Sequence, residues 1–294
     1  MKSPLFIDRI LAVWRSETLL ILLAALIAGC DGNITSAGVG TGGTGTTTTL
    51  VGKVADGYLV NVSVFLDKNG NYQLDAGEPS ATTDANGAYT LTVDTADVGQ
   101  CPIVALAIKG IAIDKDTNLP VANSYVLSMP KESVSGTIST NFISPLSSQL
   151  REIMETGLFS TLPQASDALR TKIGLPAGTD MMADYIAANN AGMHATAQNI
   201  ALLMGNQMGN VLNTNGSITT VDVNRYRGMM GTIFSNMSSL RGADSQSGMS
   251  NLNSFMTTIL PNMPPTNVNQ PFHNMSTSFR GSIGGMNTMI NRMR

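Results

Sequence analysis

VSVFLDKNGNYQLDAGEPSATTDANGAYTLTV, residues Val62 to Val93, is the stretch that decides the fold of the N-terminal half. Apolar residues recur at every second position at both of its ends, from Val62 to Leu66 and again from Tyr89 to Val93. Side chains of a strand point alternately to its two faces, so this spacing predicts two strands, each buried on one face. Asn86-Gly87 lies between them and supplies the positive φ that a hairpin turn needs.

Further strands are predicted on the C-terminal side of this stretch. β-Branched and other apolar residues dominate Ile103 to Ile113 and Val121 to Leu127, and the polar loop Asp114 to Asn118 separates the two runs. Short strands joined by turn-forming residues are typical of small antiparallel sandwiches. We therefore expect residues 49–135 to form a β-sandwich.

The pattern becomes helical beyond residue 139. Ser144 followed by Pro145 is a typical helix start, and apolar residues then stand three and four apart until Gly157 ends the helix. Stripes with the same spacing predict further helices at Ala197–Val211, Val223–Leu240, Met249–Ile259 and Phe279–Met293. The predicted fold class is α+β in two domains: the small antiparallel β-sandwich, then an all-α, methionine-rich helical bundle over residues 139–294.

The first thirty residues have the pattern of an export signal. Basic residues precede an uncharged apolar core, Leu19 to Ile27, which is too short to span a bilayer comfortably. The core runs into Leu26-Ile27-Ala28-Gly29-Cys30, which resembles the lipobox of bacterial lipoproteins. The resemblance implies that residues 1–29 are a signal peptide and that Cys30 is lipidated. Gly, Thr, Ser and Ala dominate the stretch that follows and form no apolar face, so we expect residues 30–48 to be a flexible tether. An uncleaved anchor helix is the alternative, and it would place Glu17 at or inside the membrane.

A lipidated Cys30 implies a lipid-anchored protein of the bacterial cell envelope. In enteric bacteria an Asp directly after this Cys, here Asp31, tends to keep a lipoprotein at the inner membrane. Other lineages do not follow that rule. The periplasmic face of the inner or the outer membrane and the cell surface therefore all stay open.

A twelve-residue polar loop, Asp67 to Glu78, lies inside the stretch quoted above. Oxygen-bearing side chains occupy its positions 1, 3, 5, 9 and 12, and position 7 can offer its main-chain carbonyl. Ca²⁺ takes about six to eight oxygen ligands, and this spacing lets alternate residues point at one ion. The predicted calcium ligands are Asp67, Asn69, Asn71, Gln73, Asp75 and Glu78. Position 6 is Tyr72 instead of glycine, so we expect Gly70 to supply the bend.

The loop and the turn after it resemble two kinds of module. Asp67 to Pro79, followed by Thr83 to Tyr89, is similar to the B-type calcium-binding repeats of surface adhesins and to carboxypeptidase-regulatory-like (transthyretin-like) sandwich domains. The likeness covers residues 50–95 well and fades by residue 130, and we recognise no family in the helical half. It implies a calcium-stiffened stalk or contact module without catalysis. The alternative is a polar loop that only forms turns.

Methionine is abundant, with 18 in the chain. Three groups have a spacing that allows a thioether copper site: Met193-His194, Met204 with Met208, and Met286 with Met289 and Met293. Most methionines of the helical half also fall on the apolar stripes, where this side chain fills gaps in a core. Packing is therefore the expected role, and a copper-binding protein is the runner-up.

Signals of catalysis and of nucleic-acid binding are weak. The two histidines, His194 and His273, belong to no motif of a serine or cysteine nucleophile. Cys101 opens an apolar run, so we expect it to be buried. The arginines beyond residue 223 lack interleaved aromatic residues, so we expect a solvated face, or contact with anionic lipid or glycan, and no nucleic-acid partner. These arginines are Arg225, Arg227, Arg241, Arg280, Arg292 and Arg294.

The sequence therefore predicts a non-enzymatic envelope lipoprotein with Ca²⁺ as its cofactor. Its helical domain is expected to bind a protein or glycan partner or to assemble with itself. Two alternatives stay open: a methionine-rich periplasmic copper-binding protein, and an accessory binding module of a polysaccharide-processing complex.

Overall fold

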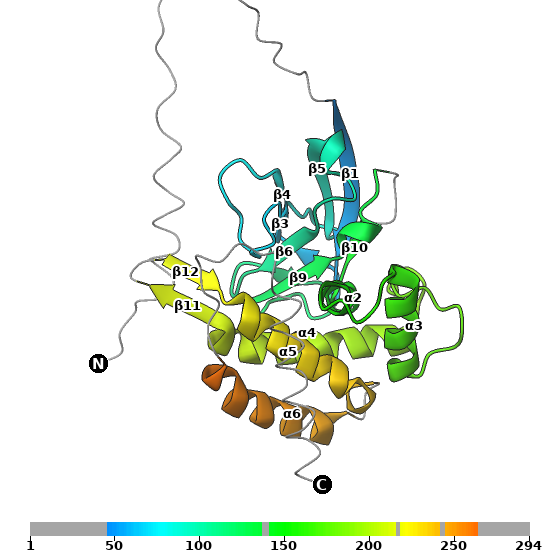
Figure 1. The fold of residues 1–294 in the computed structure, drawn as a ribbon, viewed down its shortest axis with the longest axis vertical. Helices are drawn as coiled ribbons and strands as arrows, with labels where there is room; N and C mark the ends of the chain where they lie inside the picture. Colours follow the sequence, from blue (N-terminus) through cyan, green and yellow to red (C-terminus); the bar gives the residue numbers. More distant parts are fainter. Residues whose placement is uncertain (1–45, 137–140, 216–217, 242–244, 264–294) are drawn as a thin grey trace, which may run out of the picture. The chain divides into compact units, whose positions relative to one another are not determined.

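The computed structural model of the chain describes residues 46–136, 141–215, 218–241 and 245–263 (Figure 1). Strands dominate the N-terminal part of these residues, and five α-helices follow in the C-terminal half, which confirms the α+β class. The described residues from 46 to 213 and from 220 to 263 belong to one compact unit. None of the described helices combines the length and the hydropathy that crossing a membrane requires.

Two sheets pack on each other as in a sandwich. The first has the order β10-β1-β5, with β10 at Asn141–Ile143, β1 at Thr47–Val54 and β5 at Ala88–Asp94. The second has the order β4-β3-β6-β9, with β4 at Ser80–Thr82, β3 at Ser63–Leu66, β6 at Ile103–Ala107 and β9 at Tyr125–Met129. β5 contacts β3 and β4, and β10 contacts β6 and β9, so the sheets share one interior.

Strand boundaries differ from the prediction in four places. The predicted strand Val121 to Leu127 is β9, which starts only at Tyr125 and runs to Met129. β1 starts two residues inside the predicted tether, and β10, from the predicted helical domain, pairs with β1 in parallel. The predicted strand Ile103 to Ile113 ends at Ala107, since the chain turns at Gly110, whose φ is 75°. The polar loop after it joins the short strands β7 (Ile113–Asp114) and β8 (Leu119–Pro120), which form a small sheet with β2 (Leu59–Val60).

The period-2 pattern holds for one of the two opening strands. In β5 the predicted inward residues are buried and Thr90 and Thr92 are exposed. In β3, Phe65 is buried together with Val64 and Leu66, so side chains on both faces of this strand are covered. Gly87 has the expected positive φ of 71°, but its turn connects two different sheets, since β4 pairs with β3 and β5 pairs with β1.

Five α-helices follow the strands. They are α2 (Pro145–Glu155), α3 (Leu162–Ile173), α4 (Ala191–Val211), α5 (Val223–Ser235) and α6 (Gln246–Ile259). The start of α2 is confirmed, with Ser144 and Ser147 forming a reciprocal capping box. α5 ends five residues before the predicted limit Leu240, and the chain continues through a 3₁₀ turn at Met237–Ser239. The predicted helix Phe279–Met293 lies outside the described residues.

Helix α3 was not predicted from the sequence. Thr161 caps its first turn, Pro163 stands at its second position, and Gly174 ends it with a φ of 76°. These are ordinary start and stop signals, so they could have revealed the helix. Its buried stripe, Ala165, Leu169 and Ile173, is short, and it is easily overlooked beside the longer stripes that follow. Between α4 and α5 the chain forms a hairpin of β11 (Leu212–Asn215) and β12 (Ile218–Val221).

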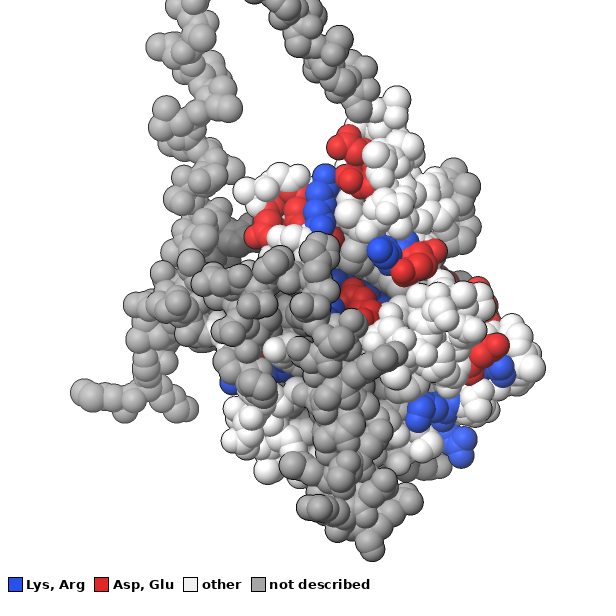
Figure 2. All heavy atoms as spheres, in the orientation of Figure 1, with Lys and Arg blue, Asp and Glu red and all other residues white. Residues whose placement is uncertain are grey.

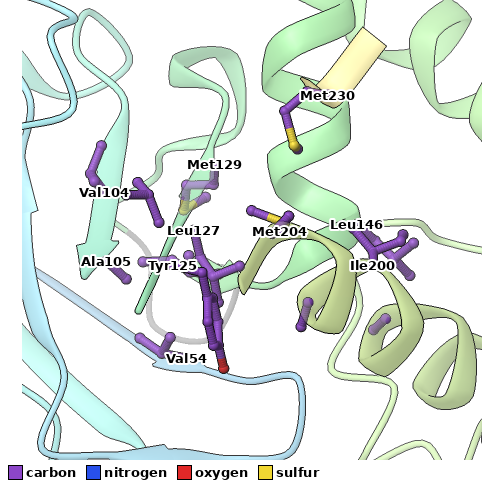
Figure 3. Close-up of a cluster of buried hydrophobic side chains, with 14 of the residues drawn as sticks. Val54, Val104, Ala105, Tyr125, Leu127, Met129, Leu146, Ile200, Met204 and Met230 are labelled. Carbon is purple, nitrogen blue, oxygen red and sulfur yellow. The ribbon is translucent and has the colours of Figure 1, made fainter. Parts of the chain in front are cut away.

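Strands and helices share one hydrophobic core. Figure 3 draws Leu127 and Met129 from the second sheet in the same buried cluster as Met204 and Leu146 from the helices. Most methionines on the stripes of the described helices are buried there, as expected from their spacing: Met204, Met208, Met230, Met237, Met249 and Met256. Met154 on α2 is half-buried. Whether residues 139–294 also fold independently stays a prediction.

The helices also close the free edge of the second sheet. Ser128 in the edge strand β9 donates its amide to Ser148 Oγ at 2.8 Å and accepts the hydroxyl of Ser147 at 2.6 Å, both from α2. Tyr226 of α5 donates its hydroxyl to the Val126 carbonyl at 3.0 Å. An uncovered edge strand pairs readily with other chains, so these contacts protect the fold as well as joining strands to helices.

Candidate functional site

The loop Asp67 to Glu78 connects β3 to β4, which pair in antiparallel fashion. Its backbone turns through three residues with positive φ: Gly70 at 73°, Tyr72 at 62° and Gly77 at 90°. The expectation that Gly70 bends the loop in place of position 6 is therefore incomplete, because Tyr72 adopts the left-handed conformation itself. That conformation is strained for a residue with a Cβ and needs support from its surroundings.

Three of the predicted ligands converge inside the loop. The side-chain amides of Asn69 and Asn71 both donate to Asp75 Oδ2, at 2.6 and 2.7 Å. The amide oxygen of Asn69 accepts the main-chain N–H of Asn71 at 3.1 Å, and that of Asn71 accepts the N–H of Gln73 at 2.8 Å. These bonds hold the side chains of Asn69, Asn71 and Asp75 close together on one side of the loop.

Glu78 closes the loop on itself. Its two carboxylate oxygens accept the main-chain N–H groups of Lys68 at 2.7 Å and of Asp75 at 3.0 Å. Burial raises the pKa of Glu78, and the nearby carboxylates of Asp67 and Asp75 raise it further. Like charges therefore oppose one another across the loop, and a cation placed among them would relieve that repulsion.

Asp67 has a different environment from the other predicted ligands. It is fully buried, and its oxygens accept the N–H groups of Asn71 at 3.0 Å and Tyr72 at 3.3 Å. Its Oδ2 also forms an ion pair with Arg151 Nη2 at 3.0 Å. Asp67 thus shapes the loop and anchors it to α2, with most of its acceptor capacity in use.

The donor set fits calcium only if neutral oxygens take part. Among the described residues, no three or more Asp, Glu, His or Cys side chains are grouped in a way that could hold a metal ion. A calcium ion in this loop would therefore be held by Asp75 and Glu78 together with the amide oxygens of Asn69 and Asn71 and the Gln73 carbonyl. The two Asn amides would have to rotate, since their NH₂ groups now face Asp75.

Tyr72 fixes the loop to the helices. Its ring lies 4.0 Å from the Arg151 guanidinium and 4.7 Å from the Tyr226 ring. Its hydroxyl donates to the buried carboxylate of Glu152. A tyrosine held between a guanidinium and a second aromatic ring supplies the support that its left-handed backbone requires.

A charge cluster surrounds this contact, and all its members except the half-buried Glu155 are buried. It consists of Tyr72, Arg151, Glu152, Glu155 and Arg227. Burial raises the pKa of Glu152, and the neighbouring Glu155 carboxylate adds to the shift. Although burial opposes it, the guanidinium groups of Arg151 and Arg227 lower the pKa of Glu155. Arg151, Glu152 and Glu155 are close together on α2, but Tyr72 and Arg227 come from distant parts of the chain, so sequence reasoning missed this cluster.

The expectation of a solvated arginine face is wrong for Arg227. Its side chain is buried between α5 and α2 and pairs with Glu152 and Glu155. Arg241 is exposed, as expected, and the last three arginines lie outside the described residues. Figure 2 shows that several of the described basic side chains on the visible face lie beside acidic ones.

The remaining predicted positions are spread over the chain. Met193, Met204 and Met208 are buried in the core, and Met286, Met289 and Met293 lie outside the described residues. Cys101 is buried and free, which confirms that prediction. Cys30 lies outside the described residues. No known protein family, characterised protein or solved structure matches this chain.

Proposed function

We propose that the protein is a non-enzymatic lipoprotein of the bacterial cell envelope whose loop Asp67 to Glu78 binds Ca²⁺, and whose folded body presents a binding surface to a partner. The convergence of Asn69 and Asn71 on Asp75 supports the calcium site. The sequence from Leu26 to Cys30 supports the lipid anchor. The resemblance to adhesin repeats and to transthyretin-like modules supports a contact role without catalysis.

In this proposal the loop residues have separate roles. Asp75 and Glu78 supply charge, and Asn69, Asn71 and the Gln73 carbonyl supply neutral oxygens. Asp67 keeps its bonds to the loop main chain and to Arg151 and so positions the other ligands. Because Arg151 and Tyr72 hold the loop against α2, calcium binding would stabilise the junction between strands and helices as well as the loop.

The test is the thermal stability of the full chain in millimolar CaCl₂ and in chelator. A ligand that binds only the folded state at one hundred times its dissociation constant adds about 2.7 kcal/mol of stability. For a chain of this size that corresponds to a rise in Tm of roughly 5–10 °C. Isothermal titration calorimetry with CaCl₂ should show one site.

Two variants separate coordination from turn formation. Asp75→Asn should abolish both the calcium-dependent rise in Tm and the heat of binding, whereas Asp94→Asn, exposed on β5 outside the loop, should preserve both. Equal Tm values in CaCl₂ and chelator, together with no heat of binding, would show that the loop is only a turn. A calcium response that survives in Asp75→Asn would place the ion elsewhere.

A further inference from the structure

A groove of about 370 Å³ lies where helix α4 meets the β7–β8 hairpin and the beginning of β9. It is separate from the calcium loop. Its walls come from both halves of the chain, with Gln198 and Leu202 on α4 and Leu119 and Asn123 on the strand side. Gly205 of α4 allows the close approach, because a Cβ there would lie 3.1 Å from the Asn123 side chain.

The rim of the groove is apolar and unusually exposed. Leu119 has 63% of its surface exposed and Leu202 has 52%, and both line the groove. Most large apolar side chains among the described residues are buried, so two exposed leucines facing one groove indicate a surface that a partner covers.

The floor of the groove is acidic. Asp56 accepts the Tyr125 hydroxyl at 2.7 Å through Oδ2, while its buried Oδ1 accepts no hydrogen bond from another described residue. Asp114 also lines the groove, and Asp116 stands behind it, held by Gln198 at 2.8 Å. Gly57 permits this crowding, since a Cβ there would lie 2.4 Å from Asp114 Oδ1.

No lysine, arginine or histidine belongs to the described lining of the groove. Burial raises the pKa of Asp56 to about 7, and the Asp114 and Asp116 carboxylates contribute to the rise. A buried acceptor without a donor is unfavourable, and neighbouring carboxylates repel one another. Asp116 has His194 Nε2 at 2.7 Å, whereas the Asp56 carboxylate has no basic side chain beside it among the described residues. Both costs would be removed by one cationic donor placed over Asp56.

We infer that this groove binds a lysine or arginine side chain of a polypeptide partner, with apolar residues next to it. The cationic head would reach Asp56, and its neighbours would cover the two exposed leucines. An occupant that covers both rim residues extends beyond the groove, which favours a polypeptide over a free amine. The peptide does not extend the sheet through Pro120 of the edge strand β8, because proline has no N–H to donate.

The inference is tested with three capped tripeptides added to the full chain: acetyl-Leu-Lys-Leu-amide, acetyl-Leu-Gln-Leu-amide and acetyl-Leu-Glu-Leu-amide. NMR chemical-shift titration measures the affinity and locates the site. The lysine peptide should bind at least tenfold more tightly than the other two, and the shifts should concentrate on residues 117–123 and 198–205. Equal binding of all three peptides would overturn the inference.

Three variants separate the loss of peptide binding from a folding defect. Asp56→Asn should weaken binding of the lysine peptide at least tenfold, and Asp167→Asn, an exposed carboxylate on α3, should leave it unchanged. The double variant Leu119→Ser/Leu202→Ser alters only exposed side chains and should also weaken binding several-fold. If it binds like the unmodified chain, or if n-butylamine competes as strongly as the peptide, the groove is not a polypeptide site.

Discussion

The Arg151 guanidinium lies 3.0 Å from the Asp67 carboxylate, and the two side chains are only 1% and 0% exposed. This pair joins the first residue of the polar loop to helix α2 across 84 positions of sequence. Forming the pair removes two charges from water, which costs free energy. Further contacts offset this cost: Asp67 also accepts main-chain N–H groups, and Arg151 also contacts Glu155 and the Tyr72 ring.

Removal of one partner of this ion pair should therefore destabilise the folded protein strongly. Arg151→Met keeps much of the side-chain volume but leaves Asp67 charged and buried without its counterion. We expect the free energy of unfolding to fall by about 3–5 kcal/mol, measured by urea denaturation at pH 7.

The matched control is Arg170→Met, which removes an ion pair with Asp167 in helix α3, where the carboxylate is 71% exposed. Solvent screens such pairs, so the loss should stay below about 1 kcal/mol. Comparable losses in the two variants would show that burial does not set the strength of the Asp67–Arg151 contact.

The hydrogen bonds between the edge strand β9 and helix α2 lead to a second prediction. In Ser148→Ala the buried amide of Ser128 loses its acceptor, and an unsatisfied buried donor costs about 1–3 kcal/mol. Urea denaturation should show this loss. Ser254→Ala, which removes an exposed hydroxyl from α6, should change stability by less than about 0.5 kcal/mol. A Ser148→Ala variant as stable as the unmodified chain would contradict this role.

The raised pKa of Asp56 predicts that the stability of the fold depends on pH. Its pKa rises from an ordinary value of 3.8 to about 7 in the folded protein, so the folded state keeps a proton that the unfolded chain releases above pH 3.8. The contribution of Asp56 to stability should therefore fall as the pH rises through this window and stay constant above it. The groups facing Asp56, namely Asp114, Asp116, Tyr125 and Tyr185, are the same in unmodified chain and variant.

Asp56→Asn cannot titrate, so its stability relative to the unmodified chain should increase from pH 4.5 to pH 8. Urea denaturation at several pH values measures the difference. A difference that does not change with pH would mean that Asp56 titrates normally in the folded protein.

The lipid anchor predicts a defined amino terminus. Mass spectrometry of the membrane-bound protein should show an acylated Cys30 followed by Asp31, and Cys30→Ser should release the protein or stop its processing. An intact Met1 on membrane-bound protein would instead support an uncleaved anchor.

The elements that the sequence revealed are those whose signal is local. Ser144, Pro145 and the stripe that follows fix the start of α2, because capping and helical periodicity act within a few residues. β5 alternates as predicted because only one of its faces is buried. β3 does not, since burial on both faces depends on which elements cover the strand.

The sequence by itself determined the order of strands before helices, the buried methionine stripes and the spacing of oxygen donors from Asp67 to Glu78. Only the tertiary structure decided that Arg151 takes Asp67 into an ion pair, that Tyr72 packs between Arg151 and Tyr226, and that Arg227 is buried. The physical reason is the distance along the chain over which each interaction acts. Periodicity, capping and turn chemistry act within a few residues along the chain, whereas the partner of a buried charge is chosen by packing between residues as far apart as 84 positions.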